Sequence, residues 1–452
     1  MLRTPHPFNG GRNIEGDYFF LNPDCLLVTG AVGAAIYCFS TGDVYSLDSS
    51  GREAIELLER GAPIPGIQER NHKGSDFIAF LRELEALHLG SFTLSSTPPT
   101  RITMPPISSG LQKIWLEIVG GCNLRCVHCY ADSSPRKGNG NLSVEKWKCI
   151  ISEAACLGAK WIQLIGGEPL LYGKKNIFEL VSTAEAARYA FIEVFTNGTL
   201  IDDEYAIFFA EHKVHVALSL YSSRPEIHDE VTQCPGSFEC TIRSAETLQR
   251  HDVPFRVGLI IMKQNCQYAE ETLAWLKTTF GDIMVSTDVI RCTSGGRCQA
   301  DLLTSELWQK RLRTTASFPK VSLEKFADNS SGHPCLKGEV CVQSDGRVYP
   351  CIMDREHVLG NVIVTDLSKI IAGEATQSIW GLSKDHIPVC RDCEYRYACF
   401  DCPPLAAGIA GTQSGGFAKD PFCLYDPHEA GWADAGQFLE KLNLISVLLQ
   451  SK

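Results

Sequence analysis

Residues 120–130 have the sequence Gly-Gly-Cys-Asn-Leu-Arg-Cys-Val-His-Cys-Tyr and follow directly after an apolar run, Ile114 to Val119. Their three cysteines, Cys122, Cys126 and Cys129, are spaced as Cys-x3-Cys-x2-Cys, and no fourth cysteine follows nearby. Three such thiolates can hold three irons of a cubane iron–sulfur cluster and leave the fourth iron open to a small ligand. The alternatives are a structural zinc knuckle, with His128 inside the triplet as a further ligand, and a group of buried thiols without a metal.

Size and charge exclude several classes of protein. A chain of 452 residues predicts two or three domains. It has no run of eighteen apolar residues and no hydrophobic signal core at its start, which predicts a cytoplasmic protein without a membrane partner. A net charge of −11 argues against nucleic acid, because binding phosphates needs a basic face. Twenty cysteines in a reducing compartment indicate metal or redox chemistry rather than disulfides.

Apolar runs alternate with amphipathic segments six times after residue 113. This rhythm predicts a parallel sheet with right-handed helical crossovers. The expected strands are Ile114–Val119, Trp161–Ile165, Phe191–Thr196, Val214–Tyr221, Phe255–Met262 and Ile283–Ile290. One helix is expected over Ser143–Leu157, ended by Gly158, with Cys149 and Cys156 filling its core.

The triplet in this context resembles the radical S-adenosylmethionine (SAM) enzymes, and the six βα units match their open partial barrel. The resemblance implies that SAM chelates the open iron and is cleaved to methionine and a 5′-deoxyadenosyl radical. Gly166-Gly167-Glu168-Pro169 resembles the family's glycine-rich SAM motif. The resemblance implies that the SAM-binding residues are Tyr130, Gly166, Gly167, Glu168, Pro169, Asn197 and Ser219. An arginine that relatives place three residues after a His-Asp pair is missing after His228-Asp229.

Eight cysteines in the last third of the chain, in an arrangement that includes Cys-x2-Cys-x5-Cys-x2-Cys, resemble the SPASM domain, which carries auxiliary iron–sulfur clusters. The resemblance implies a first auxiliary cluster on Cys335, Cys341, Cys351 and Cys402. It implies a second on Cys390, Cys393, Cys399 and Cys423, hence three [4Fe-4S] clusters in all. Two zinc sites are the alternative. Cys292 and Cys298 flank a Gly-Gly turn where a substrate could enter.

The N-terminal region predicts a β-hairpin, Ala35–Ser40 with Val44–Asp48, followed by helices around Ile55 and from about Ser75. This pattern resembles the winged-helix element that binds leader peptides by adding them as a strand to a sheet edge. A DNA-binding winged helix or a packing domain are the alternatives, and the acidic helices disfavour DNA.

These features together predict an α/β protein with a partial (β/α)6 barrel, an N-terminal winged-helix-like domain and a C-terminal cysteine-rich SPASM domain. The predicted domains are leader recognition (1–95), linker (96–112), barrel (113–300), bridging region (301–334) and SPASM domain (335–452), with an amphipathic helix from about Phe438 to Leu449. No catalytic side chain beyond the cluster ligands is assigned.

The resemblance implies a radical SAM oxidoreductase that crosslinks a ribosomally made precursor peptide bearing a leader. A flavodoxin- or ferredoxin-type protein would donate electrons. The link is either carbon–carbon, as in cyclophanes, or thioether, and the unseen peptide decides which. Alternatives are a sulfatase-maturating, formylglycine-generating enzyme and a non-catalytic iron–sulfur interaction protein.

Overall fold

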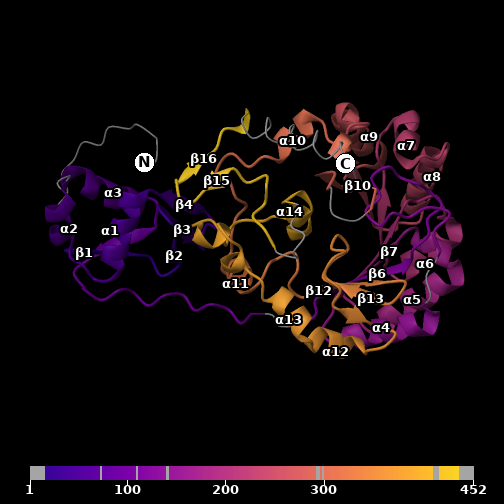
Figure 1. Cartoon of the computed structure of the whole chain (residues 1–452), viewed down its shortest axis with the longest axis horizontal. Helices are drawn as coiled ribbons and strands as arrows, with labels where there is room; N and C mark the ends of the chain where they lie inside the picture. The colour runs from indigo at the N-terminus through magenta and orange to yellow at the C-terminus, as the bar shows by residue number, and fades with distance from the viewer. Residues whose placement is uncertain are drawn as a thin grey trace.

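A computed structural model describes residues 16–71, 74–107, 110–138, 142–291, 296–297, 300–410 and 417–436. Figure 1 shows an elongated molecule, with the N-terminal domain at one end, the barrel at the other and the cysteine-rich region between them. The expected C-terminal helix and both Cys292 and Cys298 lie outside the described residues. Among those described, no helix has both the length and the apolar composition to cross a membrane.

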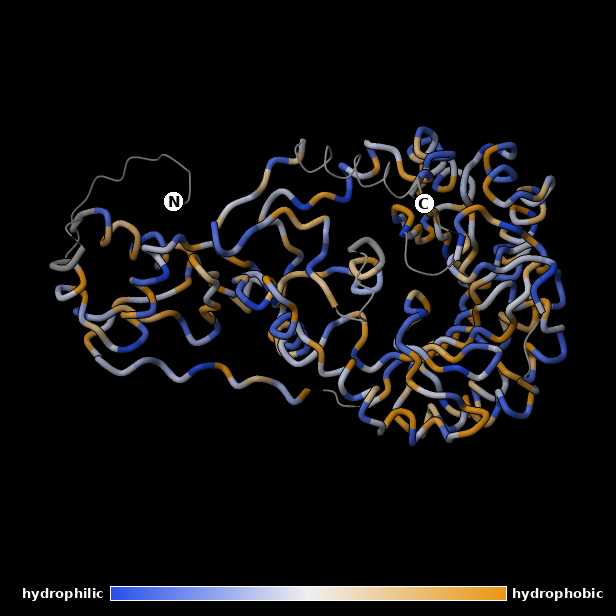
Figure 2. Tube along the Cα trace, in the orientation of Figure 1, coloured by the Kyte–Doolittle hydropathy of each residue, from blue (hydrophilic) through white to orange (hydrophobic). Residues whose placement is uncertain are grey.

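Six parallel strands in chain order form the barrel sheet, which confirms the predicted fold class. They are β6 (Lys113–Val119), β7 (Trp161–Gly166), β8 (Phe191–Thr196), β9 (His215–Ser219), β10 (Phe255–Ile261) and β11 (Met284–Val289). The intervening helices are α4 (Val144–Cys156), η1 (Pro169–Tyr172), α5 (Lys174–Ala186), α6 (Asp203–Glu211), α7 (Pro225–Thr232), α8 (Ser237–Arg250), η2 (Cys266–Tyr268) and α9 (Ala269–Phe280). In Figure 2 polar and apolar residues alternate along these helices, as one-sided burial requires.

Helix α4 shows how the sequence sets the ends of an element. The Ser143 side chain accepts a hydrogen bond at its start, and Gly158 follows its last turn at a φ of 110°. The residues buried on its inner face are Trp147, Ile150, Ile151 and Ala154. The expectation that Cys149 and Cys156 fill the core is wrong, because both lie off this stripe and are exposed.

The cysteine-rich region extends the barrel sheet, which the sequence did not predict. Strand β12 (Glu339–Gln343) pairs in parallel with β6, and β13 (Arg347–Tyr349) and β14 (Gly360–Asn361) continue antiparallel to give nine strands. These strands are too short for a clear alternation of residue types. The other elements of the second half are η3 (Ala300–Leu302), α10 (Ser305–Arg311), α11 (Leu323–Ser331), α12 (Leu367–Ala372), α13 (Glu374–Trp380), η4 (Lys384–His386), η5 (Cys390–Asp392), α14 (Pro403–Ala410), β15 (Tyr425–Asp426) and β16 (Gly431–Trp432).

The N-terminal domain is built on an antiparallel sheet in the order β2 (Cys25–Thr29), β3 (Ala34–Cys38), β4 (Val44–Leu47). It contains the expected hairpin, here β3 and β4. Helices α1 (Ser49–Glu59), α2 (Ile64–Asn71) and α3 (Gly74–Ala86) follow, and β1 (Tyr18–Leu21) pairs with β5 (Gly90–Thr93). One face of the sheet packs on these helices and the other packs on the cysteine-rich region.

Candidate active site

The cysteine triplet lies in the loop after β6, at the carboxyl end of the parallel strands. The Cys122 side chain is buried, and those of Cys126 and Cys129 are partly exposed. The Cys122 sulfur accepts a hydrogen bond from the Leu124 amide at 3.4 Å, and the Cys129 sulfur accepts one from the Ser133 amide at 3.3 Å. Donors aimed at sulfur stabilise the thiolate form that iron requires.

Burial makes the free thiolate form of these cysteines costly. Burial raises the pKa of Cys122 to about 12 and also raises the pKa of Cys126. In both cases burial is the largest cause, and the neighbouring thiolates add to the rise. Iron would offset this cost, because a coordinating thiol is deprotonated.

The spacing of the sulfurs argues against the zinc alternatives. In the described part of the chain, three metal-ligating atoms lie within 4.8 Å of one another only at Asp24, Cys25 and Cys38. None of the eleven cysteines assigned to clusters belongs to such a group. Four ligands on one zinc ion must converge, whereas each thiolate of a cubane binds a different iron and stands farther from the others. The arrangement therefore suits clusters better than single zinc ions.

The glycine-rich motif packs directly on the cysteine loop. The Gly167 amide donates to the Val119 carbonyl at 2.8 Å, and the Glu168 amide donates to the Gly121 carbonyl at 2.9 Å. A Cβ atom on Gly167 would lie 1.8 Å from the Gly121 oxygen. The sequence suggested that small residues here make room for a ligand. The structure shows that the close neighbour of Gly167 is the cysteine loop itself.

The Glu168 side chain links the segment after β7 to the end of β8. Its fully buried carboxylate accepts hydrogen bonds from the Thr196 hydroxyl at 2.6 Å, the Asn197 amide at 2.8 Å and the Leu170 amide at 3.0 Å. Burial, the largest cause, raises the pKa of Glu168 to about 7 despite these bonds. The Asn197 side-chain amide points at the Cys122 sulfur at 3.7 Å.

Several polar atoms around the triplet are buried without a hydrogen-bond partner among the described residues. They are His128 Nδ1, the Tyr130 hydroxyl, the Ser133 hydroxyl and His228 Nε2. Burial lowers the pKa values of His128 and His228 to about 4, so both rings are neutral at physiological pH. Unsatisfied buried polar groups are costly, so their concentration here fits a polar ligand at the carboxyl ends of the strands.

A buried ion pair joins the barrel to the cysteine-rich region. Arg355, four residues after Cys351, donates to both carboxylate oxygens of Glu117 on β6, at 2.5 and 3.1 Å. Its guanidinium also lies 5.4 Å from the centre of the Tyr130 ring. Arg355 therefore links the loop of one predicted cluster to the residue that follows Cys129 of the other.

The predicted ligands of the second auxiliary cluster lie close together. Burial is the largest cause that raises the pKa of Cys390, to about 12, and the Cys399 and Cys423 thiols add to the rise. Burial and then Glu394, Cys399 and Cys423 raise the pKa of Cys393 in the same way. Arg313 donates to the Cys399 sulfur at 2.8 Å.

The predicted ligands of the first auxiliary cluster are unevenly connected: Cys341 shares a buried apolar cluster with Cys351, and the other three cysteines interact more directly with one another. Burial and then Cys402 raise the pKa of Cys335 to about 12, and burial and then Cys335 raise that of Cys351. Cys341 lies fully buried on β12, where Glu117 and Arg355 are its strongest charged neighbours and Cys351 comes after them. The structure thus brings Cys335, Cys351 and Cys402 together, and Cys341 stays a prediction as the fourth ligand.

Comparison with known proteins matches two regions of the chain. Residues 116–276 match the Radical SAM superfamily, and residues 335–394 match the SPASM iron–sulfur cluster-binding domain. The chain belongs to the radical SAM/SPASM family of enzymes. S-adenosylmethionine and iron–sulfur clusters are its cofactors.

Relatives of this radical SAM enzyme differ in substrate. An AdoMet-dependent heme synthase from Oleidesulfovibrio alaskensis is 23% identical over 74% of this chain and 92% of its own length. The subtilosin biosynthesis protein AlbA from Bacillus subtilis is 23% identical over 73% of this chain and 75% of its own length. The structure of Streptococcus suis SuiB bound to the precursor peptide SuiA is similar in fold, with a TM-score of 0.55 and 15% identity over 90% of this chain and 99% of that one.

Arg297 is a basic residue that sequence reasoning missed in this radical SAM enzyme. It donates to the Cys126 carbonyl at 3.1 Å, the Ser133 carbonyl at 2.6 Å and the Asp132 carboxylate at 2.6 Å. These hydrogen bonds stabilise the loop of the cysteine triplet, although Arg297 lies far from that loop in the sequence. Arg313 and Arg355 were also missed, because no local pattern marks an arginine that reaches a distant loop.

Proposed function

We propose that this radical SAM enzyme is a peptide maturase that installs intramolecular crosslinks in a ribosomally made precursor peptide. The observation that carries the proposal is that the N-terminal sheet, which has an outer strand, packs on the cysteine-rich region, and that this region extends the barrel sheet. The similarity to SuiB, a structure titled as bound to its precursor peptide, covers 90% of the chain and supports the proposal.

Strand β4 is the proposed docking edge for a leader peptide. The Cys38 amide donates to the Asp43 carbonyl at 3.0 Å, which sets the hydrogen-bonding register of β3 and β4. In this register the backbone groups of Val44 and Ser46 point away from β3, towards the outer edge of the sheet. An extended peptide added there would gain main-chain hydrogen bonds with little demand on its sequence.

The interior of the barrel would receive the core of the peptide. The Arg256 guanidinium bonds Glu193 at 2.8 and 3.0 Å, and Arg355 bonds Glu117 nearer the triplet. These two ion pairs provide polar groups inside the barrel that would orient a peptide, and each pair carries no net charge. A cavity of about 350 Å³, whose lining includes Arg291 and Cys402, lies beside the end of β11.

The cofactors supply the radical chemistry. When bound, the triplet cluster and SAM would supply a radical able to abstract hydrogen from an unactivated carbon. The protein's own part is to hold the peptide carbon near the strand ends, to exclude water and to keep His128 and His228 neutral. Each link, carbon–carbon or thioether, would remove two hydrogens from the peptide: the SAM-derived radical would take one as an atom, and the other would leave as a proton while its electron passes to an iron–sulfur cluster.

We propose three [4Fe-4S] clusters, on the triplet and on the two auxiliary cysteine sets. The auxiliary clusters would take up the surplus electron of each link, and an external flavodoxin- or ferredoxin-type protein would reduce the triplet cluster. The grouping of four thiols at Cys390, Cys393, Cys399 and Cys423 supports the second auxiliary site.

The test is the mass of a short peptide encoded beside this gene and produced together with the enzyme without oxygen. We expect a loss of two hydrogens or a multiple, absent when Cys122, Cys126 and Cys129 are all replaced by Ala. Fragmentation would then locate the bond. An unchanged peptide mass while 5′-deoxyadenosine still forms would refute crosslinking and point to another substrate, such as a folded protein.

A further inference from the structure

The N-terminal sheet covers the second group of auxiliary cysteines with its outer face. Val28, Ala35 and Tyr37 are buried on that face. They belong to one apolar cluster with Tyr395 and Ala398, and the partly buried Cys393 and Cys423 pack against the same cluster. The domain expected to bind a leader peptide therefore also forms part of the wall around two of the cluster ligands proposed above.

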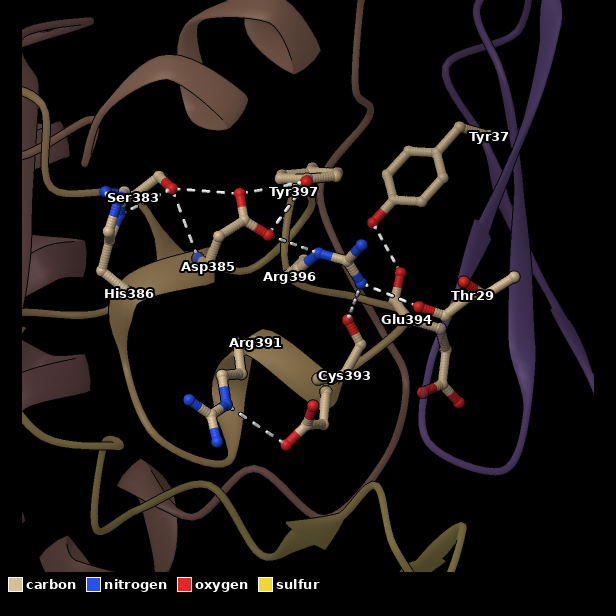
Figure 3. Close-up of polar contacts among 11 residues, drawn as sticks. Thr29, Tyr37, Ser383, Asp385, His386, Arg391, Cys393, Glu394, Arg396 and Tyr397 are labelled. Carbon is tan, nitrogen blue, oxygen red and sulfur yellow. Dashed lines mark hydrogen bonds and ion pairs between the residues drawn. The ribbon is translucent and has the colours of Figure 1, made fainter.

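The contact is made with the loop that carries Cys393, as Figure 3 shows. The Tyr37 hydroxyl donates to the Glu394 carbonyl at 3.0 Å, and the Ala31 amide donates to the Asp392 carbonyl at 2.7 Å. The Tyr395 hydroxyl donates to the Ser46 hydroxyl at 2.7 Å. Strand β3, strand β4 and the turn after β2 thus each form one hydrogen bond with a residue of the Cys393 loop.

The Glu394 side chain is seated in the β2–β3 turn. A Cβ atom on Gly30 would lie 2.4 Å from its carboxylate, and a Cβ atom on Gly33 would lie 3.1 Å from it. The Tyr425 hydroxyl donates to the same carboxylate at 2.5 Å. Because Gly30 and Gly33 have no side chains, the turn has room for the Glu394 side chain from the loop that carries Cys393.

Arg396 joins the sheet to the loop most directly. Its Nη1 donates to the Thr29 carbonyl at 2.9 Å and to the Cys393 carbonyl at 2.8 Å, and its Nε donates to Asp385 at 2.8 Å (Figure 3). One guanidinium thus bonds the end of β2, the backbone of a proposed cluster ligand and η4. Hydrogen bonds from a charged donor are among the stronger ones in proteins.

We propose that the N-terminal sheet is the outer wall of the second auxiliary cluster, and that Arg396 is the positioning residue that holds the Cys393 loop against it. The inference rests on the proposed assignment of Cys390, Cys393, Cys399 and Cys423 as the ligands. Solvent access and hydrogen bonding around a cluster set its stability and its reduction potential. The leader-recognition domain would then be required for an intact redox site as well as for binding peptide.

The test compares Arg396→Gln with Arg391→Gln in the full, reconstituted chain. Arg391 is in the same stretch of chain and carries the same charge, but it is exposed and pairs only with Asp392 among the described residues, at 3.7 Å (Figure 3). Release of iron to a chelator is followed anaerobically. We expect Arg396→Gln to release about four irons, the content of one cubane, about tenfold faster than Arg391→Gln.

Three further comparisons separate shielding of the cluster from a general loss of stability. The midpoint potential of each cluster is followed by electron paramagnetic resonance. Both variants lose one positive charge, so a difference between them does not come from the change in net charge. A more positive potential of one cluster in Arg396→Gln than in Arg391→Gln would therefore report added solvent access to that cluster. Tyr37→Phe removes one hydrogen bond and keeps the packing, so it should show a smaller effect in the same direction. Arg396→Lys should restore part of the slow release.

The outcomes are distinct. If Cys390→Ala/Cys393→Ala protein holds as much iron as the parent, the ligand assignment fails and the inference fails with it. If that variant lacks about four irons but Arg396→Gln and Tyr37→Phe behave like Arg391→Gln, the assignment stands and the N-terminal sheet is no wall of the cluster.

Discussion

Replacing Arg355 by Met should destabilise the protein strongly, because it leaves a buried carboxylate without its partner. The side chains of Arg355 and Glu117 are only 15% and 7% exposed. Methionine keeps the apolar length of the arginine stem but removes the guanidinium, which lies 5.4 Å from the centre of the Tyr130 ring and 5.8 Å from that of Tyr349. The main effect is therefore electrostatic.

The expected cost follows from the geometry of the pair. Breaking a buried, bidentate ion pair by removing one partner costs about 3–5 kcal/mol, because the remaining charge is desolvated.

The assay is urea unfolding of the anaerobic apoprotein with Arg355→Met, Glu117→Met and the double variant. We expect the double variant to recover most of the stability, because two apolar side chains replace the pair. Arg347→Met is the matched control, since its pair with Asp345 is 50% and 38% exposed and should contribute under about 1 kcal/mol. A cost below about 1 kcal/mol for Arg355→Met, or a double variant no more stable than it, would contradict the reasoning.

Three further changes test other parts of the site. Gly167→Ala should lower the iron content after reconstitution by about one four-iron cluster, because the added Cβ overlaps the cysteine loop, whereas Gly138→Ala has nothing within 4 Å and should not. Burial raises the pKa of Glu168 from 4.5 to about 7, so the folded apoprotein keeps a proton that the unfolded chain has lost. Its free energy of unfolding should thus fall as the pH rises through this range, and Glu168→Gln should remove about 3 kcal/mol of that dependence in thermal unfolding. Lys384→Met leaves the buried Asp401 without its ammonium partner and should cost about 3 kcal/mol in urea unfolding; a cost near zero would exclude a structural role.

The sequence predicted those parts of the fold that depend on local patterns. Most barrel strands are largely apolar runs long enough to span a buried sheet, so their positions could be found within a few residues, although β11 also carries Ser286, Thr287 and Asp288 and is exposed or partly exposed throughout. The hairpin of β3 and β4 was visible because the Thr41-Gly42-Asp43 turn separates two alternating runs, and Gly42 has the positive φ of 75° that such a turn needs.

The proposed metal ligands could also be selected from the sequence, because a cluster needs several cysteines at short, regular spacings. The same reasoning assigned Cys341 to the first auxiliary cluster but could not show that it lies on β12, because the parallel pairing of β12 with β6 spans more than 200 residues of chain. Likewise, Cys149 and Cys156 differ from core residues only by the helical face on which they fall.

The amino-acid sequence by itself therefore determined the family, the barrel and the cysteines available to iron, since each follows from the order of neighbouring residues. Only the tertiary structure decided that the cysteine-rich region lies between the N-terminal domain and the barrel, that Arg355 joins the barrel strand to a distant loop, and that Arg396 ties the N-terminal sheet to Cys393. These contacts join residues far apart in the chain, and their partners are mostly backbone carbonyls or buried charges. Such partners carry no local sequence signal, because every residue has a carbonyl and a charge is recognised as buried only when the chain around it is folded.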